Sequence, residues 1–477
     1  MTSQVETRRG MGATVRRRGL GFLVLTAALT GGLLSCGAKA DPRLAGSWRG
    51  PETNGWIPVR LQGSPAQIGF QHGYLLAPEI ADALAVIKLS LTHDNAPRDW
   101  GFFRTAAQTM LWPRIGEEYR QELKGLVEGL AAHGVTADLA DVVALNANLE
   151  LGDYARWLSR QKTPGKAERC SAFVATGRWT RDGKVVIAHN NWSGYLEGAR
   201  WNIIFDIRPQ EGHRILMDGF PGLIHSGDDF GMNSAGIVIT ETTIGSFHGF
   251  NPEGVPEFVR ARRAMQYAAS IDDFARVMEE GNNGGYANTW LVADVGRNEI
   301  ARLELGLVNV TLERSSDGYF VGANYPINPK LTAEETDFAV NDPGISSNAR
   351  RARWEQVMAQ SKGKIDVELA KAFLADHVDA FGGKADAPSE RTLCGHVDLS
   401  PRGMKPWQEE FGPAGVVQAK AADAGMVCAL EMWAAIGHPC GLNFVAAEHL
   451  KRYPKYAWEK DLLRDLPSRP WTRFTAR

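Results

Sequence analysis

The hydrophobic pattern in the first part of the chain has a helical period. From Ala66 to His93 apolar residues recur at helical spacing, and the ranges 102–112, 115–133 and 139–157 repeat this pattern. Gly134 directly follows the range 115–133 and is placed to end a helix there. The chain before residue 158 is therefore predicted to be mostly helical.

After residue 170 the pattern changes to short apolar strands separated by turns. Asp182-Gly183 is a typical turn signal between the first two strands. Helical spacing returns within 258–280 and 349–377, and strand-like sequence closes the region near 415–437. The order of helices, strands, helices and strands favours an α+β fold with antiparallel sheets over a doubly wound parallel sheet. The predicted strands lie within 171–179, 184–192, 201–209, 213–221, 236–245 and 289–306.

A polar, basic stretch separates these two parts. "SRQKTPGKAER" (159–169) contains Pro164-Gly165 and carries net positive charge, which is typical of an exposed linker. We therefore expect a helical N-terminal segment over 41–158, the linker over 159–169 and a catalytic domain over 170–477.

Residues 1–40 resemble an export signal. Arginines precede the apolar run "GLGFLVLTAALTGGLL", which is short and interrupted for a spanning helix. "LLSC" would place a lipid on Cys36 and attach the protein to a membrane, whereas "AKA" before Asp41 fits ordinary signal-peptidase cleavage. Both endings predict an exported protein of the periplasm or cell envelope.

Composition and missing motifs argue against several classes of function. The formal net charge of -2 argues against a nucleic-acid partner. The chain has no GxSxG, HExxH, Walker or GxGxxG motif, and its histidines show no metal-ligand spacing. We therefore expect no metal and no cofactor.

Four cysteines remain beyond the export signal. Outside the cytoplasm a disulfide between Cys394 and Cys440 is our prediction, with buried free thiols as the alternative. Cys428 is left without an expected partner. No paired CxxC is present, so the spacing does not predict a zinc site.

Cys170 opens the first strand directly after the linker. If peptide bond 169–170 is cut, Cys170 acquires an α-amine with a pKa near ~7.7–8. Such an amine can act as general base for its own side chain. The thiolate would attack a carbonyl, and the resulting oxyanion would need a donor such as an Asn amide. The alternative is a structural cysteine at the start of a strand.

Several motifs, in one order, resemble two related families. They are "CSAFVATG…GKVVIAHNNWSGY", "LIHSGDDFGMNSAGIVITETTIG", "GGYANTWLVAD" and "SSNARRARW". The chain resembles the phospholipase B-like family most at "HNNW" and "SGDDF…ETTIG". It resembles the autoproteolytic acyltransferase family of penicillin biosynthesis most at "IGFQHG", "ANTW", "TLCGHVD" and "GHPC". Both are N-terminal-nucleophile (Ntn) hydrolases, and the resemblance runs from Gly63 to Phe444.

The resemblance implies an αββα sandwich of two antiparallel sheets between helical layers. It also implies self-cleavage before Cys170, after which the small and large chains stay associated. Cys170 matches the nucleophile and Asn288 the oxyanion donor. His189 and Trp192 match the phospholipase B-like pattern, and Arg350 matches an arginine near the site, although Arg351 and Arg353 lie close by.

The first hairpin allows a geometric test of these assignments. A turn over 180–183 would place Trp192 or Ser193 across from Cys170. Trp192 would then form a wall of the site. His189 would lie about three residues farther along, roughly 10 Å away, and would reach the cysteine only through a bulge or an intermediary.

These features predict an exported, self-processing cysteine hydrolase. It would cleave an amide or ester of an acylated small molecule through an acyl-enzyme. The alternatives are a phospholipase B-like lipid deacylase, an acyltransferase to an amine acceptor, and a non-catalytic envelope lipoprotein that binds a ligand and stays uncut.

Overall fold

The computed structural model describes residues 41–159, 169–227, 230–383, 385–404 and 408–477. The predicted export signal, Cys36 and most of the predicted linker lie outside these residues. Residues 41–477 form one compact unit. Within the described ranges, no helix has the length and apolar character needed to cross a membrane.

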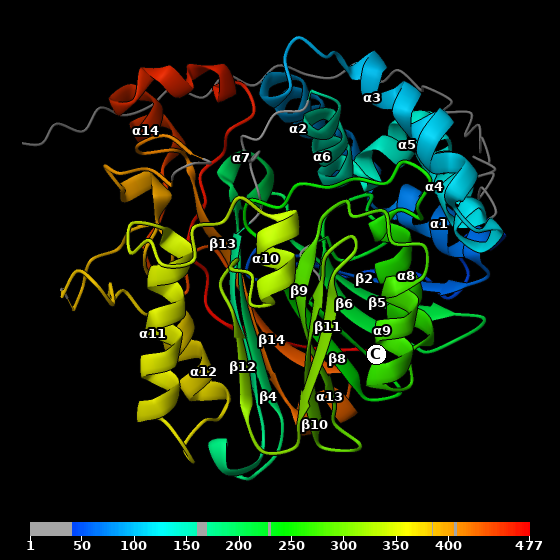
Figure 1. Cartoon of the computed structure of the whole chain (residues 1–477). Coiled ribbons are helices and arrows are strands. Elements are labelled where there is room, and N and C mark those ends of the chain that lie inside the picture. Colours follow the sequence, from blue (N-terminus) through cyan, green and yellow to red (C-terminus); the bar gives the residue numbers. More distant parts are fainter. Residues whose placement is uncertain (1–40, 160–168, 228–229, 384, 405–407) are drawn as a thin grey trace, which may run out of the picture. The chain divides into compact units, whose positions relative to one another are not determined.

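Two β-sheets form the centre of this unit (Figure 1). The nine-stranded sheet has the order β1-β2-β5-β6-β7-β8-β9-β10-β11. Its strands are β1 (Trp48–Arg49), β2 (Ile57–Gly63), β5 (Ile203–Pro209), β6 (Ile215–Gly219), β7 (Gly231–Asn233), β8 (Ile237–Thr243), β9 (Asn288–Asp294), β10 (Glu299–Leu305) and β11 (Val310–Ser315).

The second sheet has six strands in the order β12-β3-β4-β13-β14-β15. These strands are β3 (Arg169–Ala175), β4 (Val186–Gly194), β12 (Tyr319–Gly322), β13 (Ala414–Asp423), β14 (Glu431–Ile436) and β15 (Thr472–Thr475). The named strands pair antiparallel in both sheets, except for β2 and β5, which are parallel. The predicted antiparallel sheets are therefore confirmed with this one exception.

The two sheets pack face to face. β3 contacts β8 and β9, and β12 contacts β9 and β10. Val174, Ala188, Val238 and Leu291 belong to one buried cluster that includes this interface. Strands buried on both faces read as nearly continuous apolar runs, as "KVVIAHNNW" does. Polar residues in such strands therefore stand out as candidates for function.

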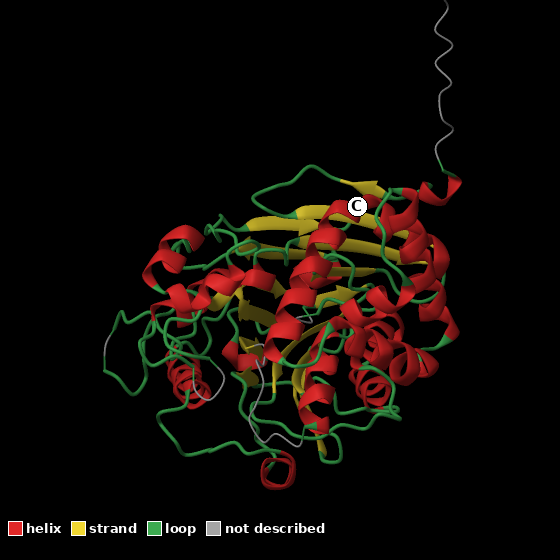
Figure 2. Ribbon diagram, turned by 90° about the horizontal axis from the view of Figure 1, so that it is seen from above, coloured by secondary structure: helices red, strands yellow, loops and turns green. Residues whose placement is uncertain are grey.

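Helices cover the outer face of the nine-stranded sheet (Figure 2). The predicted helix over 66–93 divides at Leu76, next to Ala77-Pro78, and Gly134 ends α4 with a φ of +87°. The helices of this layer, together with those that pack on it, are α1 (Pro65–Leu75), α2 (Ala77–Asp94), α3 (Trp100–Ala106), α4 (Glu117–Ala132), α5 (Leu139–Asn146), α6 (Asn148–Leu158), α8 (Glu257–Tyr267) and α9 (Ile271–Glu279).

Glycines bring α1 and α4 into close contact. A Cβ at Gly69 would lie 1.8 Å from the Glu122 carbonyl oxygen, and one at Gly129 would lie 2.2 Å from the Phe70 carbonyl oxygen. Only a residue without a side chain fits at such distances. The spacing of four residues between Gly69 and Gly73 places both on the same face of α1.

A second helical layer covers the six-stranded sheet. α11 contacts β12, and α12 contacts β4 and β13 (Figure 1). The two helical layers with two sheets between them confirm the predicted α+β, αββα fold. The remaining helices are α7 (Tyr195–Gly198), α10 (Pro329–Glu335), α11 (Ser346–Gln360), α12 (Val367–Leu374), α13 (Ala424–Cys428) and α14 (Ala446–Arg452).

The N-terminal segment is built into the fold of the rest. β2 lies inside the nine-stranded sheet beside β5. The sequence did not predict β2, because Pro58 and Gly63 interrupt its apolar pattern. The Gly222 N–H donates to Nε2 of buried His72 at 3.0 Å, which joins α1 to the part after residue 170. Residues 41–158 thus share one core with residues 170–477.

Candidate active site

Cys170 lies fully buried in β3, opposite Asn191 of β4. The predicted partner, Trp192 or Ser193, is wrong by one or two residues. The connection between the strands holds a 3-10 helix over Gly177–Trp179, so the hairpin is not centred on the predicted turn. A shift of one residue moves every side chain to the other face of a sheet.

This register brings His189 to the cysteine. His189 pairs with Ala172, two residues from Cys170, and therefore lies on the same face of the sheet. The Cys170 sulfur, a His189 ring nitrogen and a Glu241 carboxylate oxygen all lie within 4.8 Å of one another. The predicted separation of about 10 Å is therefore wrong, and no bulge is needed between β3 and β4.

Glu241 faces the thiol from the other sheet. Its Oε1 lies 3.8 Å from the Cys170 sulfur and accepts a hydrogen bond from the Tyr286 hydroxyl at 2.8 Å. Both Glu241 and Cys170 are fully buried. A buried carboxylate that lies next to a thiol can act as a general base and accept the thiol proton.

Trp192 does not wall the thiol. It pairs with Arg169 and so lies on the opposite face of β4 from Asn191. There it packs with Val397 and Met404, and the Arg350 guanidinium lies 4.4 Å from its ring centroid. The expectation that Trp192 borders the site on the side of the sulfur is therefore wrong, and its contact is with Arg350.

Arg350 lies in the first turns of α11 and holds the backbone of the cysteine. Its Nη1 donates to the Cys170 carbonyl oxygen at 2.6 Å and to Ser171 Oγ at 3.1 Å. Burial lowers the pKa of Arg350 to about 9, so the group stays cationic near neutral pH. Arg351 and Arg353 instead bond Glu355 and Asp376, so the arginine at the site is Arg350.

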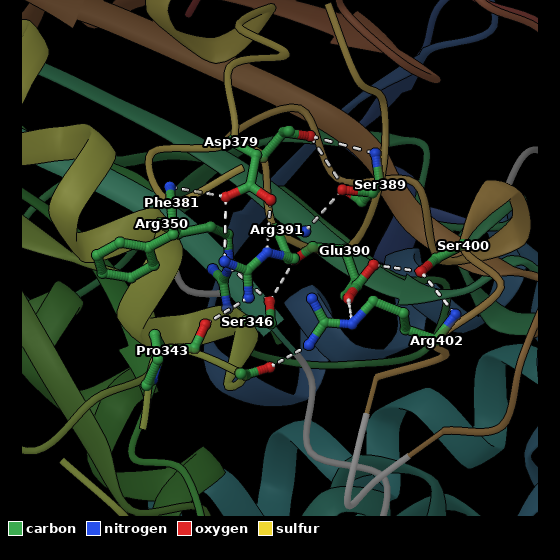
Figure 3. A network of polar contacts seen from close by, with 12 residues as sticks. Pro343, Ser346, Arg350, Asp379, Phe381, Ser389, Glu390, Arg391, Ser400 and Arg402 are labelled. Carbon is green, nitrogen blue, oxygen red and sulfur yellow. Dashed lines mark hydrogen bonds and ion pairs between the residues drawn. The ribbon is translucent and has the colours of Figure 1, made fainter. Parts of the chain in front are cut away.

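Figure 3 shows how a polar network fixes Arg350. Arg350 Nε donates to Ser346 Oγ at 3.2 Å, and that hydroxyl donates to the Glu390 carbonyl oxygen. Beside them, Arg391 bonds both oxygens of Asp379. The start of α11 is thereby tied to the loop over 376–402.

Asn324 binds the backbone nitrogen of Cys170. The Cys170 N–H donates to Asn324 Oδ1 at 3.0 Å, and Arg350 Nη2 donates to the same oxygen at 3.0 Å. Asn324 Nδ2 donates to the Thr243 carbonyl oxygen at 2.9 Å, and its backbone has a φ of +64°. Non-glycine residues with positive φ are uncommon, and those held by several hydrogen bonds concentrate at functional sites.

Asn288 is the first residue of β9 and is fully buried. Its two amide atoms have no hydrogen-bond partner among the residues that the structure describes. Thr243 pairs with Asn288 and Glu241 with Trp290, so Asn288 and Glu241 are neighbours on one face of the nine-stranded sheet. A buried amide without a partner is costly unless a ligand or intermediate uses it.

Sequence reasoning missed four residues of this cluster: Glu241, Tyr286, Asn324 and Asn191. The signal for Glu241 was present, because a charged residue interrupts the apolar strand "GIVITETTIG". Asn191 lies opposite Cys170, and its amide also lacks a partner within the described ranges. The positive φ values of Asn324 and Tyr286 have no equivalent in the sequence pattern.

The other cysteines differ from the prediction. Cys394, Cys428 and Cys440 are free thiols, so the predicted disulfide between Cys394 and Cys440 is not formed, and the alternative of free thiols holds. Cys394 is buried, Cys440 is half-buried and Cys428 is exposed. Cys394 and Cys440 nevertheless lie close together, both beside His396.

Comparisons with known proteins agree with the motifs. Residues 101–310 match the family model for phospholipase B, a range that includes Cys170, His189, Trp192 and Asn288 but not Arg350. The chain is 24% identical over 352 residues to "Putative phospholipase B-like 1" of Caenorhabditis elegans, covering 66% of this chain and 60% of the relative.

Two further relatives match over shorter ranges. "Putative phospholipase B-like 2" of Rattus norvegicus is 32% identical over 141 residues, which is 26% of this chain and 24% of the relative. An uncharacterized protein of Archaeoglobus fulgidus is 26% identical over 260 residues, which is 50% of this chain and 42% of the relative. The chain thus spans less than two thirds of the length of these relatives. Their similarity confirms the predicted resemblance to the phospholipase B-like group.

Among solved structures, a variant of conjugated bile acid hydrolase from Clostridium perfringens covers 56% of this chain and 89% of its own. The sequence identity is 11% and the TM-score is 0.34. This likeness is too low to establish a shared fold, and the αββα description rests on the strand pairing and helix packing given above.

Proposed function

We propose that this protein is a self-processing cysteine hydrolase that cleaves an amide or ester bond of an acylated substrate. The observation that carries the proposal is the surroundings of Cys170. Its sulfur faces Glu241 and His189, its N–H bonds Asn324, and its carbonyl oxygen bonds Arg350. The match of residues 101–310 to the phospholipase B family model supports the same class of chemistry.

The first proposed step is cleavage of the chain. Cys170 Sγ attacks the carbonyl carbon of Arg169 while Glu241 or His189 accepts the thiol proton. The bond from Arg169 to the Cys170 nitrogen breaks, that nitrogen takes a proton, and a thioester forms. Water then hydrolyses the thioester, which releases the Arg169 carboxylate, restores the thiol and leaves an α-amine on Cys170.

The second proposed step is turnover with this amine as the base. The amine would lie where the Cys170 N–H now donates to Asn324 Oδ1, 3.0 Å away. It accepts the thiol proton, and the thiolate attacks the substrate carbonyl. The Asn288 amide donates to the oxyanion, the leaving amine or alcohol takes the proton, and water hydrolyses the acyl-cysteine.

Arg350 and Trp192 act in this proposal as positioning residues. Arg350 holds the Cys170 carbonyl oxygen, and Trp192 lies against the Arg350 guanidinium. The guanidinium is fixed by Ser346 and Asn324 as well. The cysteine backbone therefore stays in place when the peptide bond before it is lost.

A lipid deacylase is the second candidate function. The family-model match and the phospholipase B-like relatives favour it over acyl transfer and over non-catalytic binding. It differs from the first candidate in its substrate, a lipid ester, and not in the roles of Cys170 and Asn288.

A substrate panel tests the proposal and separates the two candidates. Cleaved protein is assayed on the p-nitroanilide and the p-nitrophenyl ester of one acyl chain, and on lysophospholipid micelles. We expect turnover that is lost in Cys170→Ala and retained in Cys428→Ala, since Cys428 is exposed and forms no part of the cluster. Turnover of micelles alone identifies the lipid deacylase. Turnover that survives Cys170→Ala, or no turnover of any probe, contradicts the proposal.

We also propose that the protein is exported to the periplasm or cell envelope, supported by the basic and apolar pattern of residues 1–40. Mass spectrometry of the mature N-terminus is the test. A chain that starts at Asp41 indicates signal-peptidase cleavage, and a lipid-modified Cys36 indicates a membrane-attached lipoprotein. An unprocessed Met1 contradicts export by this signal.

A further inference from the structure

Four potential metal ligands converge outside the Cys170 cluster. His377, Cys394, His396 and Cys440 each offer one nitrogen or sulfur, and these four atoms lie within 4.8 Å of one another. They come from two separate segments: the loop over 376–402, which carries His377, Cys394 and His396, and the turn after β14, which carries Cys440. None of them takes part in the chemistry proposed for Cys170.

The distances match the edges of a tetrahedron around zinc. Zn–N bonds of about 2.05 Å and Zn–S bonds of about 2.3 Å give N–N edges of about 3.3 Å and S–N edges of about 3.5 Å. His377 Nε2 lies 3.2 Å from His396 Nε2. The sulfurs of Cys394 and Cys440 lie 3.5 and 3.6 Å from that same nitrogen.

Hydrogen bonding does not account for this arrangement. The imidazole Nε2 of His396 has either one proton or one lone pair in its plane, so it can form one good hydrogen bond. Three polar atoms nevertheless surround it at 3.2–3.6 Å. A cation at the centre of the four atoms satisfies all of them at once. A disulfide would join the two sulfurs and would leave the two ring nitrogens with only each other as partners in this cluster.

Neighbouring groups orient the two histidines for a metal. His377 Nδ1 lies 3.0 Å from Asp386 Oδ1, a carboxylate contact that leaves Nε2 as the ligand atom. His396 Nδ1 faces Asp398 Oδ1 at 3.9 Å, and the His396 ring stacks on His438 with centroids 3.9 Å apart. Metal-bound histidines commonly have such a carboxylate or carbonyl partner on the second nitrogen.

We infer that His377, Cys394, His396 and Cys440 bind one structural Zn²⁺ ion. Binding releases two thiol protons, so the ion with two thiolates and two neutral imidazoles carries no net charge. That neutrality suits a site in which Cys394 and His396 are fully buried. Four protein ligands leave no open position, which is typical of a structural and not a catalytic zinc site.

The site would fasten the loop that supports Arg350. Gly395, between two of the ligands, packs so tightly on Trp192 that a Cβ there would lie 1.9 Å from the ring. Trp192 in turn lies against the Arg350 guanidinium. The metal would thus hold the outer side of the six-stranded sheet, while Cys170 works on the inner side.

Metal analysis of the full chain, purified without chelator, tests this inference. We expect one zinc per chain by inductively coupled plasma mass spectrometry. The content should fall to near zero in His377→Ala and in the Cys394→Ser/Cys440→Ser double variant. Cys428→Ser is the matched control and should keep its zinc, because Cys428 is exposed and lies outside the cluster.

Two further readouts keep the inference falsifiable when a variant folds poorly. Wild-type protein loaded with Co²⁺ should give the visible bands of a tetrahedral site and a thiolate charge-transfer band. Chelation should lower the Tm of wild type by at least about 5 °C and leave that of His377→Ala unchanged. Wild type without zinc, either with a mass lower by two hydrogens from a disulfide or with two free thiols, overturns the inference. The result is independent of whether Cys170 is catalytic.

Discussion

Cys170 and Cys394 are both fully buried, yet their neighbours differ in kind. A carboxylate and an imidazole lie at the Cys170 sulfur, Asn191 lies opposite Cys170 in β4, and Asn288 is a neighbour of the carboxylate residue Glu241. The amides of Asn191 and Asn288 lack partners within the described ranges. Around Cys394 lie a second thiol and two imidazoles at the distances of metal ligands. The first set can move a proton and hold an oxyanion, whereas the second set has the four nitrogen and sulfur atoms of a closed zinc site.

The two clusters lie on opposite faces of the six-stranded sheet. Asn191 faces the Cys170 side, and Trp192, the next residue, contacts Gly395 and Arg350 on the other side. Because side chains alternate between the two faces along β4, the Cys170 cluster and the proposed zinc site lie on opposite sides of this strand. Variants of one cluster should therefore leave the readout of the other unchanged, apart from those at the residues between them.

The largest effect should come from Glu241. Glu241→Gln keeps the shape of the side chain but removes the carboxylate that lies 3.8 Å from the sulfur. We expect chain cleavage, followed over time on a gel, to slow by roughly 10²–10⁴-fold. Zinc content should stay at the wild-type value. A variant that cleaves at the wild-type rate would remove Glu241 from the mechanism.

A smaller effect is expected at Asn288. Asn288→Ala removes the buried amide proposed to stabilise the oxyanion, and one such donor accounts for roughly 10²–10³-fold in kcat. The loss should fall on kcat, with KM changed little, in steady-state assays of cleaved protein. Asn148→Ala is the control, since that half-buried amide donates to the Leu145 carbonyl oxygen of its own segment and lies outside the Cys170 cluster. An equal loss in both variants would point to a general effect on folding.

The third prediction concerns the pH dependence of the free energy of unfolding. It arises from His72, whose hydrogen bond with Gly222 connects the N-terminal segment to the part after residue 170. Burial lowers the pKa of His72 to about 3, and its Nε2 accepts the Gly222 N–H, so the ring is neutral in the fold. The unfolded ring titrates near ~6.5. Its contribution is therefore present above pH 6.5 and is lost as pH falls toward 3, by at most about 1.4 kcal/mol per pH unit.

Urea unfolding at several pH values checks this in the uncut Cys170→Ala chain. His72→Gln keeps an acceptor and does not titrate, so the free energy of unfolding should depend less steeply on pH between 6.5 and 3. The same slope in both proteins would contradict a buried neutral His72.

The smallest effect should occur at Trp192, which touches both clusters. Trp192→Phe keeps an aromatic ring beside Arg350 but reduces its area. We expect kcat to fall by a few-fold and zinc content to stay unchanged, because neither the nucleophile nor a metal ligand is altered. Loss of zinc in this variant would show that the two clusters are coupled more tightly than their contacts indicate.

The sequence predicted the layers of the fold but not the details of the site. Helical spacing and the apolar runs after Cys170 are local patterns, and most of the helices and strands formed where predicted. The predicted register of β3 and β4 was wrong because the prediction placed the whole connection at the turn signal Asp182-Gly183. That signal does not reveal the 3-10 helix over Gly177–Trp179, which is also part of the connection. That failure exchanged the predicted positions of His189 and Trp192 relative to the thiol.

Contacts between distant segments were beyond the sequence. Asn324 reaches Cys170 across 154 residues, and its positive φ depends on tertiary hydrogen bonds. The cluster of His377, Cys394, His396 and Cys440 has no short motif, since His377 lies 17 residues before Cys394, and Cys440 follows β14, so its members meet only in the fold. Spacing rules for zinc detect ligands that are paired along the chain, and here only Cys394 and His396 are.

The most direct test of the central claim is the intact mass of purified wild type beside Cys170→Ala. The account predicts two fragments for wild type, the second starting at Cys170, and a single uncut chain for Cys170→Ala. Cys440→Ser should cleave as wild type does, which separates this result from the zinc inference. A wild-type chain that stays whole, or a Cys170→Ala chain that is cut at the same bond, would contradict Cys170 as an N-terminal nucleophile.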